Sequence, residues 1–343
     1  RQRGVAMSPT QRRRVSLAAA TLLMGAMLVT FIPDSAATPH VEPSVLSPDG
    51  RIEAVLALNG GVPAYSVSRD GSPVVQPSTL GFVFKDAAPL SGGMVIDAVE
   101  RRTVDETWKP VWGSAAEVRS HFNELTVRLK EAGGLGRHMD VVFRVFNDGL
   151  GFRYVLPEQP NLGSFDIMSE ETTFRFAGDH TVWWIRNDYD SYEHLFSETP
   201  LSALEGANTP VTMATADGLY LSIHEANLTD YSAMTLVPEA GVPNSLRAEL
   251  VPWPDGVKVV GSTPLATPWR TIQIGERPGD LVESHLIQNL NEPCAIEDTS
   301  WIRPAKYMGI WWSLHIGKET WHEGPTHGAT TANAKRYIEF AAE

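Results

Sequence analysis

The sequence predicts a mainly β protein in which two packed antiparallel sheets form a large β-sandwich. From about Pro43 to Gly275, apolar residues alternate with polar ones, which is the pattern of strands with one buried face. Five Asp-Gly pairs interrupt this region, and Asp-Gly supplies the positive φ that tight hairpin turns require. Helical periodicity is weak here, so we expect the strands to bury their apolar faces against each other.

Two hairpins can be named from these signals. They join residues 139–145 to 150–154 and residues 211–213 to 219–223. Their turns contain Asp148-Gly149 and Asp217-Gly218, and both strands of each hairpin keep one apolar face. A strand pair of this kind is the basic unit of an antiparallel sheet.

The pattern changes at the end of the sandwich domain, which we place at residues 43–290. From Asp280 to Asn289, apolar residues recur at helical spacing after an aspartate in the cap position. We expect a short helix that leads away from the sandwich. Residues 291–304 then have the composition of a linker.

Residues 305–343 predict the start of a different domain. The unalternated apolar run from Met308 to Trp312 is typical of a strand that is covered on both faces. The segment from Ala332 to Ala342 has one apolar helical face. Strand followed by helix is the opening unit of a (β/α)8 barrel, which needs about 250 residues, so we expect a truncated barrel here.

The N-terminal segment, residues 1–37, predicts a secretory signal peptide. An apolar run at 17–33 follows three arginines and ends close to a small-residue cleavage pattern near Ala37. Met7 is the favoured start, which would make residues 1–6 an upstream artefact. The competing interpretation is a retained membrane anchor, for which the run is of marginal length. We therefore expect a secreted or periplasmic protein with no membrane attachment after cleavage.

Composition narrows the possible partners. The formal net charge is −13, and a strongly acidic protein repels the phosphates of nucleic acid. Cys294 is the single cysteine, so no disulfide can form within the chain. The core must therefore hold the fold together.

The segment from Trp183 to His194 is the densest candidate site, with three acids and four large aromatic residues in twelve positions. Carboxylates suit a hard cation such as Ca²⁺, which takes about six to eight oxygen ligands. This loop cannot supply that many. From its residues alone, a solvated acidic loop is favoured over a metal site.

Two further candidates follow from position. If a barrel follows, Trp311 or Trp312 would lie near the strand end that faces the active site, where an indole can cover a pyranose ring; core packing is the competing interpretation. His224 and Glu225 could serve as an acid and base pair, but strand neighbours point to opposite faces, so a structural role is favoured. The sequence contains none of the usual serine-hydrolase, phosphate-loop, dinucleotide or zinc-protease motifs.

Four segments together resemble glycoside hydrolase family 97, and the resemblance extends over about Leu46 to Glu343. They are Asp105-Glu-Thr-Trp-Lys-Pro-Val-Trp-Gly113, Phe146-Asn-Asp-Gly-Leu-Gly-Phe-Arg-Tyr154, Thr267-Pro-Trp-Arg270 and Asn291-Glu-Pro-Cys294. The resemblance implies a β-super-sandwich of the galactose-mutarotase type, a linker, a catalytic (β/α)8 barrel and a small C-terminal β-domain. It also implies hydrolysis of α-glucosides or α-galactosides in α-linked oligosaccharides, with Ca²⁺.

The resemblance assigns two residues. The family's calcium glutamate lies in a Tyr-Asp-x-x-Glu segment that is similar to Tyr189 to Glu193, which implies that Glu193 binds the metal. The first tryptophan of the family's first barrel strand contacts sugar, and Trp311 is the matching position. The resemblance places the catalytic carboxylates beyond Glu343, so we expect no catalytic residue here and an N-terminal portion that is inactive alone.

Two other functions remain open at this stage. The ten tryptophans and the implied architecture also suit a stand-alone carbohydrate-binding module. Aldose epimerase activity through His224 and Glu225 is the third hypothesis. The sequence leaves open both retaining and inverting chemistry, and both glucose and galactose.

Overall fold

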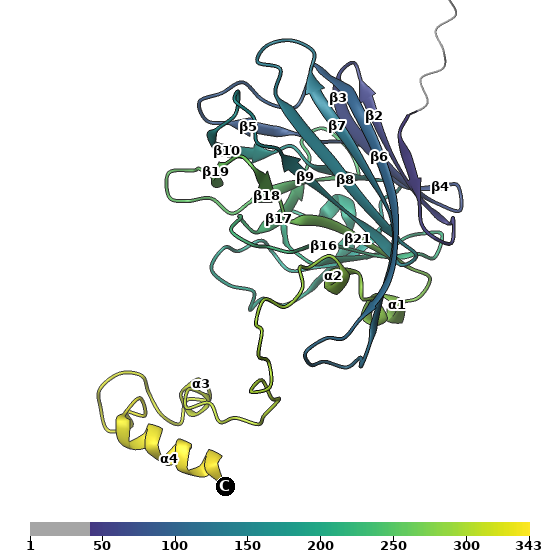
Figure 1. Ribbon diagram of the computed structural model, residues 1–343. Coiled ribbons are helices and arrows are strands. Elements are labelled where there is room, and N and C mark those ends of the chain that lie inside the picture. The colour runs from purple at the N-terminus through teal and green to yellow at the C-terminus, as the bar shows by residue number, and fades with distance from the viewer. Residues whose placement is uncertain (1–41) are drawn as a thin grey trace, which may run out of the picture. The chain divides into compact units, whose positions relative to one another are not determined.

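The computed structural model describes residues 42–343, and antiparallel β-structure dominates it (Figure 1). Two large sheets of eight and ten strands and a small sheet of three contain the named strands. The predicted mainly β, antiparallel fold class is therefore confirmed. The predicted signal peptide lies outside the described residues.

The eight-stranded sheet begins and ends at short strands. Its order is β1 (Ser44–Leu46), β2 (Ile52–Asn59), β3 (Val62–Arg69), β4 (Ser72–Thr79), β11 (Thr173–Phe176), β18 (Ser245–Leu250), β17 (Met234–Pro238) and β14 (Ala207–Asn208). The three-stranded sheet was not expected from the sequence. Its order is β19 (Val259–Ser262), β10 (Ser164–Glu170) and β5 (Phe82–Phe84).

The ten-stranded sheet carries the longest strands. Its order is β13 (Ser197–Pro200), β12 (Thr181–Trp184), β15 (Val211–Ala214), β16 (Tyr220–Ala226), β21 (Trp269–Gly275), β9 (Gly149–Leu156), β8 (His138–Phe146), β7 (Val118–Glu131) and β6 (Met94–Trp108), and β20 (Leu265–Ala266) pairs with β9. Both named hairpins are confirmed, as β8–β9 and β15–β16. Gly149 and Gly218 in their turns have positive φ values of 141° and 92°.

Aromatic side chains join the two large sheets. Tyr65 of the eight-stranded sheet lies 4.5 Å from Phe152 of the ten-stranded sheet, measured between ring centroids, and Phe143 and Phe174 pack around this pair. All four rings are almost fully buried. Rings at such distances stabilise a core by their apolar area and by edge and tilted contacts. This cluster fixes the two sheets face to face.

The predicted helix at 280–289 is present but differs in two ways. It is split into α1 (Pro278–Glu283) and α2 (Leu286–Asn289), and Asp280 caps α1 from inside its first turn by accepting the N–H groups of Glu276 and Arg277. Leu286 and Leu290 are buried against Trp269 on the outer face of the ten-stranded sheet. The expectation that this segment leads away from the sandwich was wrong. Burying these leucines against the sheet is more favourable than leaving them exposed to water.

The β6–β7 hairpin is long, and its end is tied to α2. Trp108 Nε1 donates to Asn289 Oδ1 at 2.9 Å, and Asn289 Nδ2 donates to the carbonyl of Arg119 at 3.0 Å. The loop beyond these residues carries Trp112, whose side chain is 66% exposed. Trp112 therefore contributes nothing to the core.

The C-terminal segment differs from the expectation at its first element. Residues 308–312 form no strand, and the chain there leads into a single helical turn, α3 (Trp312–His315). A parallel strand needs neighbouring strands to satisfy its backbone groups, and none within the described residues pairs with this segment. The helix predicted at 332–342 is present as α4 (Thr331–Ala342), which Thr330 caps. One 3₁₀ turn, η1 (Leu201–Ala203), completes the named elements.

Within residues 42–343, no helix combines the length and the apolar character that crossing a membrane requires.

Candidate functional site

A buried charge cluster lies where three strands meet. Arg270 of β21 donates from Nε and Nη2 to Glu170 of β10 at 2.8 and 2.6 Å, and from Nη1 to Glu225 of β16 at 2.6 Å. The guanidinium has no exposed surface. Thr172 and Tyr231 donate two further hydrogen bonds to Glu170. Charges this deep in a protein persist only when they are paired and hydrogen-bonded.

The two carboxylates of this cluster have opposite pKa shifts. Burial raises the pKa of Glu170, but the charge of Arg270 and the hydrogen bonds from Arg270, Thr172 and Tyr231 outweigh burial and leave that pKa below its ordinary value. Burial also raises the pKa of Glu225, and there the contacts with Arg270 and the Met234 amide do not overcome it. The contacts in the fold therefore compensate the burial of Glu225 less completely than the burial of Glu170.

The contacts of His224 and Glu225 fit the structural interpretation of that pair. Glu225 accepts from Arg270 with one oxygen and from the Met234 N–H, at 3.0 Å, with the other. His224 Nδ1 lies 3.0 Å from Thr209 Oγ1, and burial lowers the pKa of His224, which keeps the ring neutral near pH 7. With both oxygens of Glu225 engaged inside the fold, a structural role accounts for the contacts of this residue.

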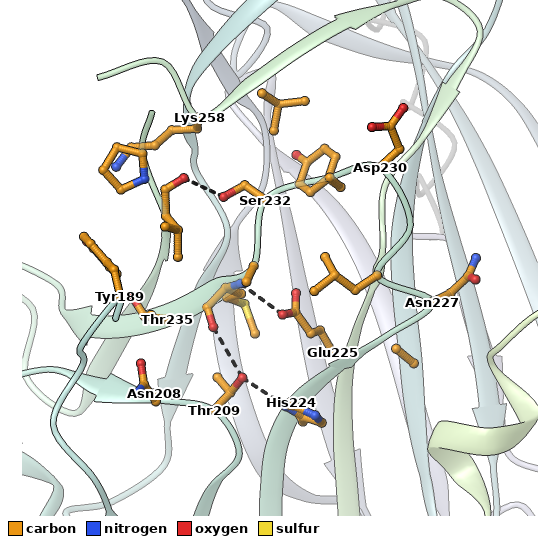
Figure 2. A pocket seen from close by; sticks show the side chains of 18 of the residues that line it. Tyr189, Asn208, Thr209, His224, Glu225, Asn227, Asp230, Ser232, Thr235 and Lys258 are labelled. Carbon is orange, nitrogen blue, oxygen red and sulfur yellow. Dashed lines mark hydrogen bonds between the residues drawn. The ribbon is translucent and has the colours of Figure 1, made fainter. Parts of the chain in front are cut away.

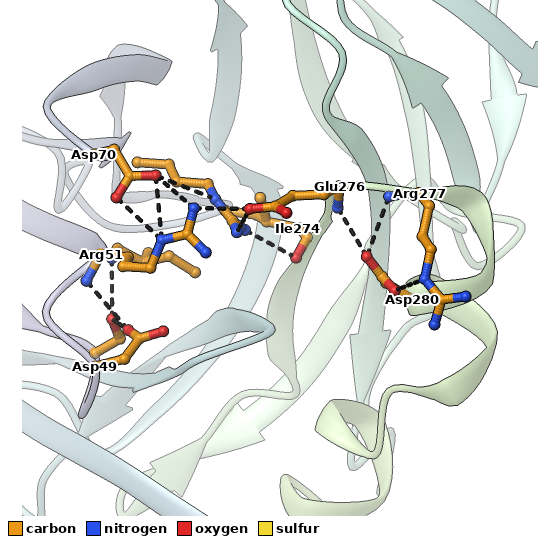
Figure 3. Close-up of polar contacts among 10 residues, drawn as sticks. Asp49, Arg51, Asp70, Ile274, Glu276, Arg277 and Asp280 are labelled. Carbon is orange, nitrogen blue, oxygen red and sulfur yellow. Dashed lines mark hydrogen bonds and ion pairs between the residues drawn. The ribbon is translucent and has the colours of Figure 1, made fainter.

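A cavity of about 1090 Å³ lies next to this cluster. It forms where β14, the end of β16, the loop 227–233 and the turn between β18 and β19 meet, as Figure 2 shows. Pockets that bind small molecules typically have about 300–1,000 Å³. The cavity is therefore large enough for a ligand of more than one sugar ring.

The cavity has a polar wall and an aromatic rim. Asn208, Thr209 and His224 lie along one wall (Figure 2). Tyr189 and Trp253 lie at its border and keep 49% and 62% of their surface exposed. Neither the polar nor the aromatic residues form a recognisable sequence motif, because they come from segments far apart in the chain.

The acidic loop that carries Glu193 is organised around a neighbouring aspartate. Asp188 accepts the Asp190 N–H at 2.9 Å and lies 2.8 Å from His194 Nε2. These hydrogen bonds, in that order, hold the pKa of Asp188 below its ordinary value. Asp188 and Tyr189 border the cavity, whereas Glu193 is exposed and does not line it.

The acidic loop of this chain can supply one ligand of a calcium site, but not the complete site. Residues 42–343 contain no group of three or more His, Cys, Asp or Glu side chains placed to hold a metal ion. The exposed carboxylate of Glu193 can supply one ligand position, whereas Ca²⁺ takes about six to eight oxygens. Glu193 stays a predicted ligand, and its partners would have to come from outside the described residues.

Trp311 also stays a prediction. It precedes α3, is 43% exposed, and contacts the rings of Trp312 and His315 at centroid distances of 6.1 and 4.6 Å. It does not line the cavity. The structure therefore does not bring the two predicted site residues, Glu193 and Trp311, into one shared cavity.

The fold places this chain among the two-sheet antiparallel super-sandwich domains. The model of a family domain described as Glycosyl-hydrolase 97 N-terminal matches residues 45–293. The chain therefore belongs to glycoside hydrolase family 97, as the sequence motifs implied.

The chain spans about half the length of the relatives that it matches. A probable retaining alpha-galactosidase of Streptomyces bingchenggensis is 32% identical over 96% of the chain and 49% of its own length. A retaining alpha-galactosidase of Bacteroides thetaiotaomicron is 25% identical over 87% and 48%. The solved structure of a family 97 enzyme from Pseudoalteromonas sp. strain K8, in complex with panose, is 41% identical, has a TM-score of 0.82, and is matched over 88% of this chain and 46% of its own. The same enzyme has been solved with acarbose.

Proposed function

We propose that this chain is the N-terminal portion of an exported, calcium-dependent α-glycosidase that cleaves α-galactosides or α-glucosides. The observation that carries the proposal is the match of residues 45–293 to the family's N-terminal domain. The activities of the two relatives support α-galactosides. The panose and acarbose complexes of the Pseudoalteromonas enzyme support α-linked oligosaccharides as ligands of the family.

In this proposal the sandwich contributes one metal ligand and the C-terminal segment contributes one sugar contact. Glu193 donates its carboxylate to calcium, which orients and polarises sugar oxygens when it is bound. Trp311 offers an indole face to a pyranose ring. A carboxylic acid that protonates the glycosidic oxygen and a second carboxyl group that attacks the anomeric carbon or activates water are expected in the half of the relatives that this chain does not span.

An activity comparison tests this division of roles. The 343-residue chain should not hydrolyse aryl α-galactosides or aryl α-glucosides, whereas a chain extended to the length of the relatives should hydrolyse one of them. Hydrolysis by the 343-residue chain would contradict the proposal.

The role of Glu193 has a readout that does not depend on activity. In the extended protein, Glu193→Gln should lower calcium affinity by at least about tenfold, because one charged ligand is lost. The measurement is the calcium-dependent shift of the melting temperature after removal of metal with EGTA. Glu205→Gln, which changes another exposed glutamate, is the matched control and should leave the shift unchanged.

Export of the protein is expected to remove the N-terminal segment. Mass spectrometry of the protein recovered from an expressing bacterium should find a mature N-terminus close to Thr38, in the periplasm or the medium. A protein that retains residues 1–37 in the membrane fraction would favour the anchor instead.

Aldose epimerase activity is disfavoured, because both oxygens of Glu225 are engaged by Arg270 and the Met234 N–H and leave no free carboxylate beside His224. Polarimetry of fresh α-glucose should show no acceleration of mutarotation.

The alternative of a carbohydrate-binding module depends on a ligand site in the sandwich itself.

A further inference from the structure

The ionisable residues that line the large cavity include more acids than bases and offer an incoming ligand no unpaired cation. Lys258 is its only lysine or arginine within the described residues, and Lys258 Nζ pairs with Glu249 Oε1 at 2.7 Å. Glu225 is paired with Arg270, and Asp188 with His194. An anionic ligand would thus find no free cation and would meet Asp230 at the border. The charges therefore disfavour an anionic ligand.

Trp253 is held in place at the border of this cavity. The Trp253 N–H donates to the Val257 carbonyl at 2.7 Å, and the Gly256 N–H donates to the Trp253 carbonyl at 2.8 Å. These bonds close a tight turn that contains Asp255-Gly256. The turn fixes the backbone position from which the Trp253 side chain extends. The ring itself remains mostly exposed and belongs to no buried cluster. A flat, exposed indole on an ordered turn is suited to cover the C–H face of a sugar ring.

The polar wall has hydrogen-bonding capacity to spare. Asn208 is buried, and all its side-chain hydrogen bonds are long: Oδ1 accepts the Asp188 N–H at 3.3 Å, and Nδ2 reaches the carbonyls of Asp188 and Ser191 at 3.4 and 3.5 Å, close to the outer limit of a hydrogen bond. His224 uses Nδ1 with Thr209, and its Nε2 has no hydrogen bond within the described residues. A buried amide and a neutral imidazole can each donate to or accept from a hydroxyl group.

From these features we propose that this cavity binds a neutral saccharide of two or three rings. One ring packs on Trp253, and hydroxyl groups of the saccharide hydrogen-bond to Asn208 and His224. The inference goes beyond the proposed hydrolase function and rests on the sandwich alone. It would hold whether or not the complete enzyme acts on the same sugar.

Calorimetric titration of the 343-residue chain with maltose and with melibiose tests the inference. We expect millimolar binding of at least one of them. Trp253→Ala should weaken it by at least about fivefold, because loss of an aromatic contact is worth about 1 kcal/mol. Trp253→Phe should retain part of the affinity, because it keeps a flat apolar face.

Trp112→Ala is the matched control. Trp112 is as exposed as Trp253, at 66% against 62%, but it does not line the cavity, so its loss should leave binding unchanged. Because both rings lie on the surface, both variants should fold, and melting curves check this.

Three results would overturn the inference. They are the absence of binding heat with both sugars, equal weakening of sugar binding by Trp253→Ala and Trp112→Ala, and tighter binding of glucuronate than of the neutral sugars. None of these measurements requires catalysis. An inactive extended enzyme with intact binding would refute only the proposed function, and an active one without binding would refute only this inference.

Discussion

Adjacent residues on β21 serve opposite faces of the ten-stranded sheet. Arg270 points inward to the two buried glutamates. Trp269 points outward, and the guanidinium groups of Arg144 and Arg153 lie over its rings, 4.7 and 4.4 Å from the ring centroid. Side chains of successive strand residues alternate between faces. The Thr-Pro-Trp-Arg motif that helped to suggest the family therefore has a structural basis in this domain.

Replacement of Arg270 should be among the most destabilising single changes. Arg270→Met would leave two buried carboxylates facing each other, and loss of one partner from such a cluster costs about 3–5 kcal/mol. Urea unfolding at pH 7 measures this. Arg247→Met, which removes the half-buried ion pair with Glu249, is the control and should cost less than about 1 kcal/mol. Equal costs would show that the cluster of Arg270 is not what stabilises the strand junction.

Glu124 gives a prediction about pH. It accepts hydrogen bonds from Arg102 and Arg144 at 2.5–2.8 Å; burial raises its pKa, but these two arginines outweigh burial and leave the pKa below its ordinary value. A carboxyl group with a depressed folded-state pKa adds stability above its unfolded pKa of about 4.3 and loses it as pH falls below that value.

Glu124→Gln should therefore lower the free energy of unfolding at pH 7 and flatten its decline below about pH 4.3. Urea titrations between neutral and acidic pH measure both effects. Glu205→Gln, an exposed change, is expected to reproduce the wild-type curve. An unchanged acid limb in Glu124→Gln would show that Glu124 does not contribute to acid sensitivity.

At the scale of elements, the β8–β9 turn shows how a local signal can determine structure. A Cβ atom on Gly149 would lie 2.2 Å from the Ile272 carbonyl oxygen, and φ is +141°. Only glycine tolerates both conditions. The same turn was predictable because Asp-Gly lies between two alternating runs.

Gly149→Ala should accordingly destabilise the domain by about 1–3 kcal/mol, because the new methyl group meets backbone that cannot yield and the φ value is strained. Thermal unfolding measures the loss. Gly218→Ala, in the second hairpin turn, has positive φ but open space around its Cβ, so it should cost less. A larger effect at Gly218 would mean that strain and not the close approach dominates.

Elements that depend on distant partners were not predictable in this way. Alternation and Asp-Gly pairs correctly predicted the hairpins, because both signals are local in sequence. The Arg270 cluster joins residues 45 and 100 positions apart, and the cavity draws on five segments, so no spacing rule indicates them. The strand expected at 308–312 needed neighbours to pair with, and the helix at 280–289 is interrupted because Leu286 and Leu290 turn toward the sheet.

For the whole molecule, the contrast between the sandwich and the C-terminal segment matters most. Residues 305–343 keep many large apolar side chains exposed. They include Tyr307, Met308, Trp312, Ile316, Trp321, Ile338 and Phe340. Exposed apolar side chains in this number favour association with other proteins or aggregation.

Limited proteolysis should therefore cut first after about Pro304 and leave a resistant fragment that contains the sandwich, because Leu314 is the only large apolar side chain of residues 305–343 that is buried. Mass spectrometry of the fragments locates the cuts. A chain that ends at Asn291 should also elute more uniformly in size-exclusion chromatography than the 343-residue chain. Equal protection of the segment and the sandwich would contradict the prediction.

The single exposed thiol of Cys294 gives direct access to the boundary between the sandwich and the C-terminal segment. Maleimide chemistry can attach one fluorophore or spin label just past α2 without any engineered mutation. The fluorescence anisotropy or the spectral line shape of the label would then report, in solution and in real time, how freely the backbone moves where the sandwich ends.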